Sequence, residues 1–179
     1  MGVMMDDFRF PVGRFVRPTE LSGADRRREI EVIAAAPANL RDAVRGLSNA
    51  QLDTPYRPDG WTVRQVVHHI PDSHANALIR FKLALTEETP TIKPYNEAAW
   101  ATLEDARTTP IEVSLSLVDG LHDRWIRILN VMSASDFART LRHPESGVLS
   151  LDQMLALYAW HSRHHVAHIT ALCSRNGWS

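Results

Sequence analysis

The sequence predicts an all-α protein: a four-helix bundle with a long connection between its second and third helices and a small hairpin before the last. Four long segments carry apolar side chains at intervals of three and four residues. Residues that favour helix starts and stops flank these segments. No internal repeat or glycine-rich phosphate loop indicates another architecture. With 179 residues the chain is long enough to bury one core, so residues 1–179 are expected to form a single domain.

The first helix is expected to follow an irregular N-terminal arm. Prolines and glycine interrupt any period within residues 1–20, and the arm's three phenylalanines are expected to anchor it over the core (Phe8, Phe10 and Phe15). Residues 22–25, Ser-Gly-Ala-Asp, are typical of a helix start. Pro37 lies inside the following segment and is expected to bend or split it. Residues 53–60, rich in proline and glycine, are predicted to be a loop.

The second helix is predicted to begin after Thr62, whose side chain can accept a hydrogen bond from an unpaired backbone N–H. Apolar residues continue at helical spacing as far as Leu85, with Pro71 expected to kink the helix. The third helix is predicted over residues 112–132. The connection between the two, about 25 residues, is too long for a simple helical hairpin and indicates a crossover or a functional loop.

The last helix is predicted to follow a hairpin. Residues 143–147, His-Pro-Glu-Ser-Gly, form a turn signal between two short apolar runs, and His143 is expected to shape that turn. Ser150 then caps a helix that runs to about Arg175, where Asn176 and Gly177 stop it.

Composition excludes several classes of protein. Lys plus Arg number 20 and Asp plus Glu 21, so no positive surplus is available for nucleic-acid phosphates and a small-molecule partner is expected. The single cysteine, Cys173, excludes an internal disulfide and a multi-thiolate metal site, and is predicted to be structural. No apolar run approaches the length of a membrane span. Residues 1–6 lack a signal-peptide or myristoylation pattern, so a cytoplasmic protein is predicted.

Four of the nine histidines fall within eight residues of the last helix (His161, His164, His165 and His168). At about 100° per residue, His161 and His165 lie closest to the buried side, whereas His164 leans toward solvent. Residues at i and i+4 project from one face, so both imidazoles of the first pair can reach one ion. His164 and His168 have the same spacing but a worse direction.

An open three-ligand site needs a further donor from a facing helix, and His68 and His69 are the candidates. The helical wheel barely separates them, although His69 lies marginally nearer the core edge. The alternative is a histidine-rich helix whose imidazoles are ordinary hydrogen-bonding groups. His74 and His122 receive no assignment from the sequence.

Two segments, residues 61–69 (WTVRQVVHH) and 158–169 (YAWHSRHHVAHI), resemble the YfiT branch of the DinB-like superfamily. Shorter matching stretches extend nearly end to end, at residues 10–13, 51–56, 79–87, 94–95, 100, 143–144 and 177–178. The resemblance implies a single DinB-like metal-binding domain, residues 1–179, that forms a homodimer. It also implies one divalent metal ion held by His69, His161 and His165. This ion is expected to be zinc, although the three histidines could also bind nickel. Pro71 departs from the family pattern, which has a small residue there, and a kink at this point would shift the imidazole of His69.

The resemblance implies a metal-dependent hydrolase, and three neutral imidazoles would leave positions open for water at the ion. Hydrolysis of a small carbonyl or amide-like substrate is therefore predicted. The sequence assigns no general acid or base; the candidates are His68, Asp72, Tyr158 and His164. The alternative enzyme is a metal-dependent S-transferase that uses a thiol of the bacillithiol or mycothiol type, with an anion pocket built from Arg80, Lys82 and Arg163. The third interpretation is a metal-binding protein without catalytic activity.

Overall fold

The computed structural model describes residues 8–178, so residues 1–6, on which the predicted lack of a targeting signal depends, lie outside the described residues. The predicted all-α bundle is confirmed by four long helices: α2 (Gly23–Ala43), α4 (Val63–Thr86), α7 (Ile111–Leu129) and α9 (Leu151–Asn176). Short helices occupy the connections: α3 (Asn49–Leu52), α5 (Glu97–Trp100), α6 (Glu104–Thr108) and α8 (Ala134–Phe137). None of the described helices is long and apolar enough to cross a membrane.

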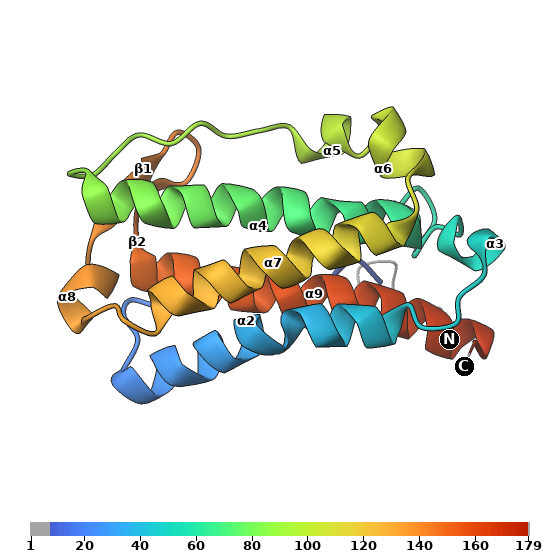
Figure 1. Cartoon of the computed structure of the whole chain (residues 1–179), viewed down its shortest axis with the longest axis horizontal. Coiled ribbons are helices and arrows are strands. Elements are labelled where there is room, and N and C mark those ends of the chain that lie inside the picture. The colour runs from blue at the N-terminus through green and yellow to red at the C-terminus, as the bar shows by residue number, and fades with distance from the viewer. Residues whose placement is uncertain (1–7, 179) are drawn as a thin grey trace.

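The order of the helices confirms the predicted crossover. Figure 1 shows α2 and α9 running in one direction along the bundle and α4 and α7 in the other. Residues 87–110, which include α5 and α6, return along the outside of α4, so that α7 begins at the same end as α4. The parallel neighbours α4 and α7 could not be joined by a short turn.

The predicted helix boundaries depend on local capping chemistry. Ser22, Thr62 and Ser150 each accept a backbone N–H from the third residue of their helix, in a capping box. Gly177 ends α9 in the left-handed conformation, at φ 65°. Pro37 does not split its helix, because α2 continues through it from Gly23 to Ala43.

The predicted hairpin precedes the last helix. Strand β1 (Thr140–His143) pairs antiparallel with β2 (Gly147–Ser150), with Leu141 opposite Leu149. The Nδ1 atom of His143 accepts the backbone N–H of Glu145 at 3.2 Å, so this histidine shapes the turn as predicted.

The N-terminal arm packs along α9, as its phenylalanines predict. The indole N–H of Trp160 donates to the carbonyl of Gly13 at 3.1 Å, and the rings of Phe15 and Trp160 lie 5.9 Å apart. Phe10 contacts the ring of His164 at 5.9 Å. The arm therefore covers part of the histidine-rich face of α9.

Candidate metal centre

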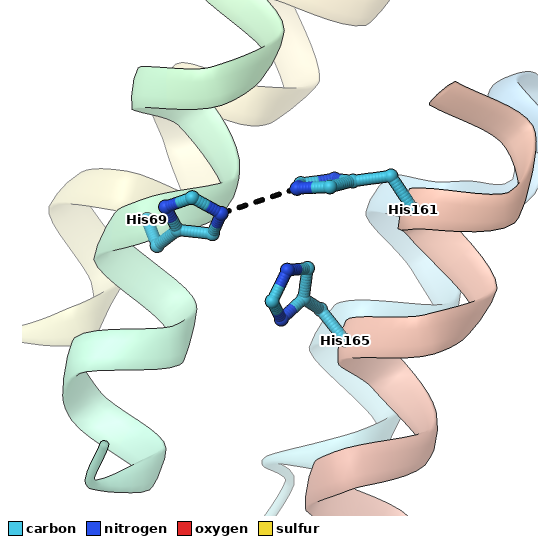
Figure 2. Close-up of side chains that lie close together, drawn as sticks. All are labelled: His69, His161 and His165. Atoms are coloured by element: carbon cyan, nitrogen blue, oxygen red, sulfur yellow. Dashed lines mark hydrogen bonds between the residues drawn. The ribbon is translucent and has the colours of Figure 1, made fainter. Parts of the chain in front are cut away.

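Three histidines from two helices converge between α4 and α9. One ring nitrogen from each of His69, His161 and His165 lies within 4.8 Å of the others. Figure 2 shows the imidazoles turned toward one another, His69 from α4 and the other two from successive turns of α9. The Nε2 atoms of His69 and His161 are 3.1 Å apart. A tetrahedral ion with Zn–N distances of about 2.0–2.1 Å would hold its ligand nitrogens roughly 3.3 Å apart, so this spacing fits such an ion.

Aromatic packing orients these rings. Trp61, directly before the Thr62 cap of α4, contacts His69 at 4.8 Å between ring centroids and lies nearly parallel to His165 at 6.4 Å. His161 and His165 meet edge to face at 4.4 Å. The capped start of α4 and the i, i+4 spacing of α9 therefore bring the two helices' imidazoles to one point.

The electrostatic environment favours neutral imidazoles. Burial, and secondarily His168, lowers the pKa of His69 to about 4. Burial is also the main reason why the pKa values of His161 and His165 lie well below the ordinary value. Near pH 7 these residues carry lone pairs rather than extra protons. Neutral imidazole is the form that binds zinc, and it also suits nickel, copper and iron.

The three histidines open onto a cavity of about 510 Å³. Five aromatic side chains contribute to its walls: Phe10, Tyr56, Trp61, Tyr95 and Trp160. Ser73, His164 and His168 also line it, with Arg9, Arg57, Asp59 and Glu97. A larger cleft of about 990 Å³ lies elsewhere, lined by residues of α2, α3 and α7, and includes none of the three histidines. The smaller cavity, not the larger cleft, therefore contains the candidate metal ligands.

The structure corrects the predicted orientation of His164. Rather than leaning toward solvent, this residue is 7 % exposed, because Trp160 stacks on it at 4.3 Å and Phe10 covers it from the arm. His168 is also buried, stacked on Tyr56 at 3.9 Å. A wheel of α9 alone omits the arm and the 53–60 loop, which supply this cover.

The structure separates the neighbours His68 and His69. His68 turns toward the start of α7: its Nδ1 lies 2.7 Å from Ser114 Oγ, and its Nε2–H donates to the carbonyl oxygen of Thr109, just before the helix, at 3.0 Å. Only His69 of the two lines the cavity. His68 is therefore a structural residue, not a member of the histidine cluster.

Sequence reasoning missed His74 and His122, which lie in the core beside the cluster. Their side chains are 0 % and 2 % exposed, and they contact each other at 2.7 Å between His74 Nδ1 and His122 Nε2. The available signal was the position of His122 in the apolar stripe of α7, between Val118 and Trp125. A polar group in such a stripe needs a buried partner.

The predicted anion pocket is wrong in its residues. Arg80 donates to the hydroxyl of Tyr158 at 3.1 Å, Arg163 pairs with Glu29 at 3.1 Å, and Lys82 is exposed. None of these three cations lines the cavity, whereas Arg9 and Arg57 do.

Among the four predicted acid or base candidates, only His164 lines the cavity. Asp72, whose pKa burial raises to about 6, does not line it.

Comparison with known proteins agrees with the fold. The model of the DinB superfamily matches residues 33–169, which include all three histidines. The chain belongs to the DinB superfamily. Its curated relatives in the superfamily include a protein of Oceanobacillus iheyensis, 50 % identical over 170 residues, which cover 95 % of this chain and 98 % of the relative. A Bacillus mycoides protein is 49 % identical over 174 residues, covering 97 % of this chain and all of the relative. Both are named "Putative metal-dependent hydrolase".

Solved structures of the same fold include YfiT from Bacillus subtilis, with a TM-score of 0.94 and 46 % identity over 97 % of this chain and 99 % of that one. YfiT is described as a "probable metal-dependent hydrolase with an unusual four-helix bundle topology". A second four-helix bundle protein, TT2238, shares 19 % identity at a TM-score of 0.58, over 82 % of this chain and 98 % of that one, and shows the fold alone.

Proposed function

We propose that this DinB-superfamily protein is a metal-dependent hydrolase of a small carbonyl or amide-like substrate. The observation that carries the proposal is the convergence of His69, His161 and His165 at a cavity, as three neutral imidazoles. These residues would hold one divalent ion, which we expect to be zinc, with nickel compatible. An ion held by three neutral ligands keeps open positions, lowers the pKa of bound water toward roughly 7 and polarises a carbonyl.

The chain's own groups can orient a substrate and a water molecule by hydrogen bonds. Burial raises the pKa of Tyr95 to about 12, so its hydroxyl stays protonated in the cavity and can donate to a substrate oxygen. His164 lines the same cavity and burial lowers its pKa to about 4, so near pH 7 its imidazole is neutral and can accept a hydrogen bond from a water molecule.

Elemental analysis of the purified protein tests the ligand assignment. We expect about one equivalent of metal in the native protein and in His68→Gln, and loss of that metal in His69→Gln and His165→Gln. His68→Gln is the matched control, because the same substitution is made one position away at a buried histidine that faces α7. Stoichiometric metal in both His69→Gln and His165→Gln would contradict the proposal.

A second candidate is the S-transferase that uses a low-molecular-weight thiol. The observation that favours it is the presence of Arg9 and Arg57 in the cavity lining, where they can pair with the carboxylates of such a thiol. Incubation of the metal-loaded protein with bacillithiol or mycothiol and an electrophile distinguishes the two. Metal-dependent conjugate formation, with no turnover of ester and amide panels, would favour the transferase and exclude the hydrolase.

The proposed assembly is a homodimer, as the resemblance to the YfiT branch implies. Val113 and Leu117 support it, since they lie one turn apart on α7 and are 57 % and 55 % exposed. A monomer in light scattering at working concentrations would contradict this assembly.

A further inference from the structure

A chain of hydrogen-bonding groups links His161 to the centre of the bundle. His161 Nδ1 lies 3.1 Å from His74 Nε2, and His74 Nδ1 lies 2.7 Å from His122 Nε2. His122 Nδ1 in turn lies 2.8 Å from the carbonyl oxygen of Ile33. This series of hydrogen-bonding groups therefore includes one group from each long helix, in the order α9, α4, α7 and α2.

A proline in α2 determines the last hydrogen bond of this series. In an α-helix the carbonyl of residue 33 would accept the N–H of residue 37, but Pro37 has no N–H. The oxygen of Ile33 is thereby left for another donor, and it meets His122 instead. Since a carbonyl can only accept, Nδ1 of His122 must carry the hydrogen.

The direction of every other hydrogen bond follows from this anchor. His74 and His122 are 0 % and 2 % exposed, and their ring nitrogens meet imidazoles and a backbone carbonyl rather than a carboxylate, so each ring is neutral and has a single N–H. Nε2 of His122 then accepts from Nδ1–H of His74, and Nε2 of His74 accepts from Nδ1–H of His161. His161 is left with a lone pair on Nε2, the atom that faces His69 in Figure 2.

The groups around His161 Nε2 agree with a lone pair there. The hydroxyl of Ser73 lies 3.4 Å away and Nε2 of His69 lies 3.1 Å away. Both groups can donate a hydrogen to that atom when no ion is bound. Within the part of the chain that the structure describes, His165 differs, because its buried Nδ1 has no hydrogen-bond partner.

We propose that His74 and His122 are positioning residues that hold His161 in the Nδ1–H tautomer and so present its Nε2 lone pair to the metal. The inference rests on the ligand assignment of the proposed function and adds how the affinity of that site is set. Hydrogen-bonding partners of metal-bound histidines fix the tautomer and raise the basicity of the ligand, and their loss commonly costs 10–100-fold in metal affinity.

Zinc affinity, measured by competition with a chromophoric chelator, tests the positioning role. His122→Phe keeps an aromatic ring but removes the acceptor for His74, and we expect zinc binding about 10–100-fold weaker. His122→Gln places an amide oxygen where it can accept from His74, and we expect it to restore most of the affinity. Equal zinc affinity in His122→Phe and the native protein, or no rescue by His122→Gln, would overturn the inference.

Long-range proton–nitrogen correlation spectra of the native protein labelled with ¹⁵N-histidine test the tautomers without a variant. In metal-free protein we expect Nδ1–H at His74, His122 and His161; an Nε2–H signal at His161 would overturn the inference. Failure of the proposed function is distinguishable. A native protein that binds no divalent ion contradicts the ligand assignment, whereas zinc binding that ignores His122→Phe contradicts the positioning role alone.

Discussion

His164 shows how covering side chains change the chemistry of a residue. Its position on α9 alone would leave it facing solvent, with a pKa near the ordinary value. Phe10 and Trp160 enclose it instead, and burial followed by the influence of His168 lowers its pKa to about 4. Near pH 7 the residue is therefore a neutral imidazole.

Removal of that cover should be visible in the titration of His164. In Phe10→Ala we expect the pKa of His164 to rise from about 4 toward the ordinary value of 6.5, because its imidazolium regains water. Proton NMR of the histidine ring signals, recorded in metal-free protein, measures the change. Phe15→Ala is the control, since Phe15 packs on Trp160 rather than on His164. An unchanged pKa in Phe10→Ala would contradict the role of the arm.

At the scale of the elements, α2 and α9 are joined by two ion pairs of different burial. Arg26 meets Asp152 through two 2.7 Å hydrogen bonds, with side chains 18 % and 5 % exposed. Arg163 meets Glu29 at 3.1 Å, with side chains 44 % and 23 % exposed. The buried carboxylate at the start of α9 depends on its partner much more than the exposed pair does.

Truncation of each arginine should separate the two cases. Arg26→Ala leaves the carboxylate of Asp152 buried without its ion-pair partner, and we expect the free energy of unfolding to fall by about 3–5 kcal/mol. Arg163→Ala breaks a partly exposed pair between the same helices and should cost at most about 1 kcal/mol. Urea denaturation of both variants measures these values. Equal losses would show that burial of Asp152 does not set the difference.

At the scale of the whole molecule, the buried histidines link stability to pH. His69, His164 and His168 each have a pKa of about 4 in the folded protein, against 6.5 in the unfolded chain. Between these values the unfolded state binds more protons, so stability is full above pH 6.5 and is lost as pH falls toward 4. Burial raises the pKa of Asp72 to about 6, which acts in the opposite direction, but it is one group against several.

Chemical denaturation in the presence of a chelator should follow this sign. We expect the free energy of unfolding to fall between pH 7 and pH 4.5, with each such histidine contributing up to about 1.4 kcal/mol per pH unit. His164→Phe removes one of these groups from an aromatic environment and should flatten the dependence. A stability that is constant across this range, or that rises toward pH 4.5, would contradict the buried neutral state of the cluster.

The sequence by itself determined the helices and the α9 part of the cluster. Capping residues such as Thr62 and Ser150 act through bonds to residues three positions away, and the spacing of His161 and His165 is local to one helix. The four-helix bundle, its crossover and the hairpin were therefore predictable from local patterns and connection lengths. His69 was favoured over His68 by the resemblance more than by periodicity.

Only the tertiary structure decided which groups meet across helices. It brought His69 to the α9 pair, turned His68 to Ser114, and buried His164 under the arm. It also joined His74 and His122 to a carbonyl that Pro37 leaves free, although these groups lie far apart in sequence. The physical reason is that a helical period specifies a face, whereas hydrogen-bond partners and burial depend on which other faces pack against it.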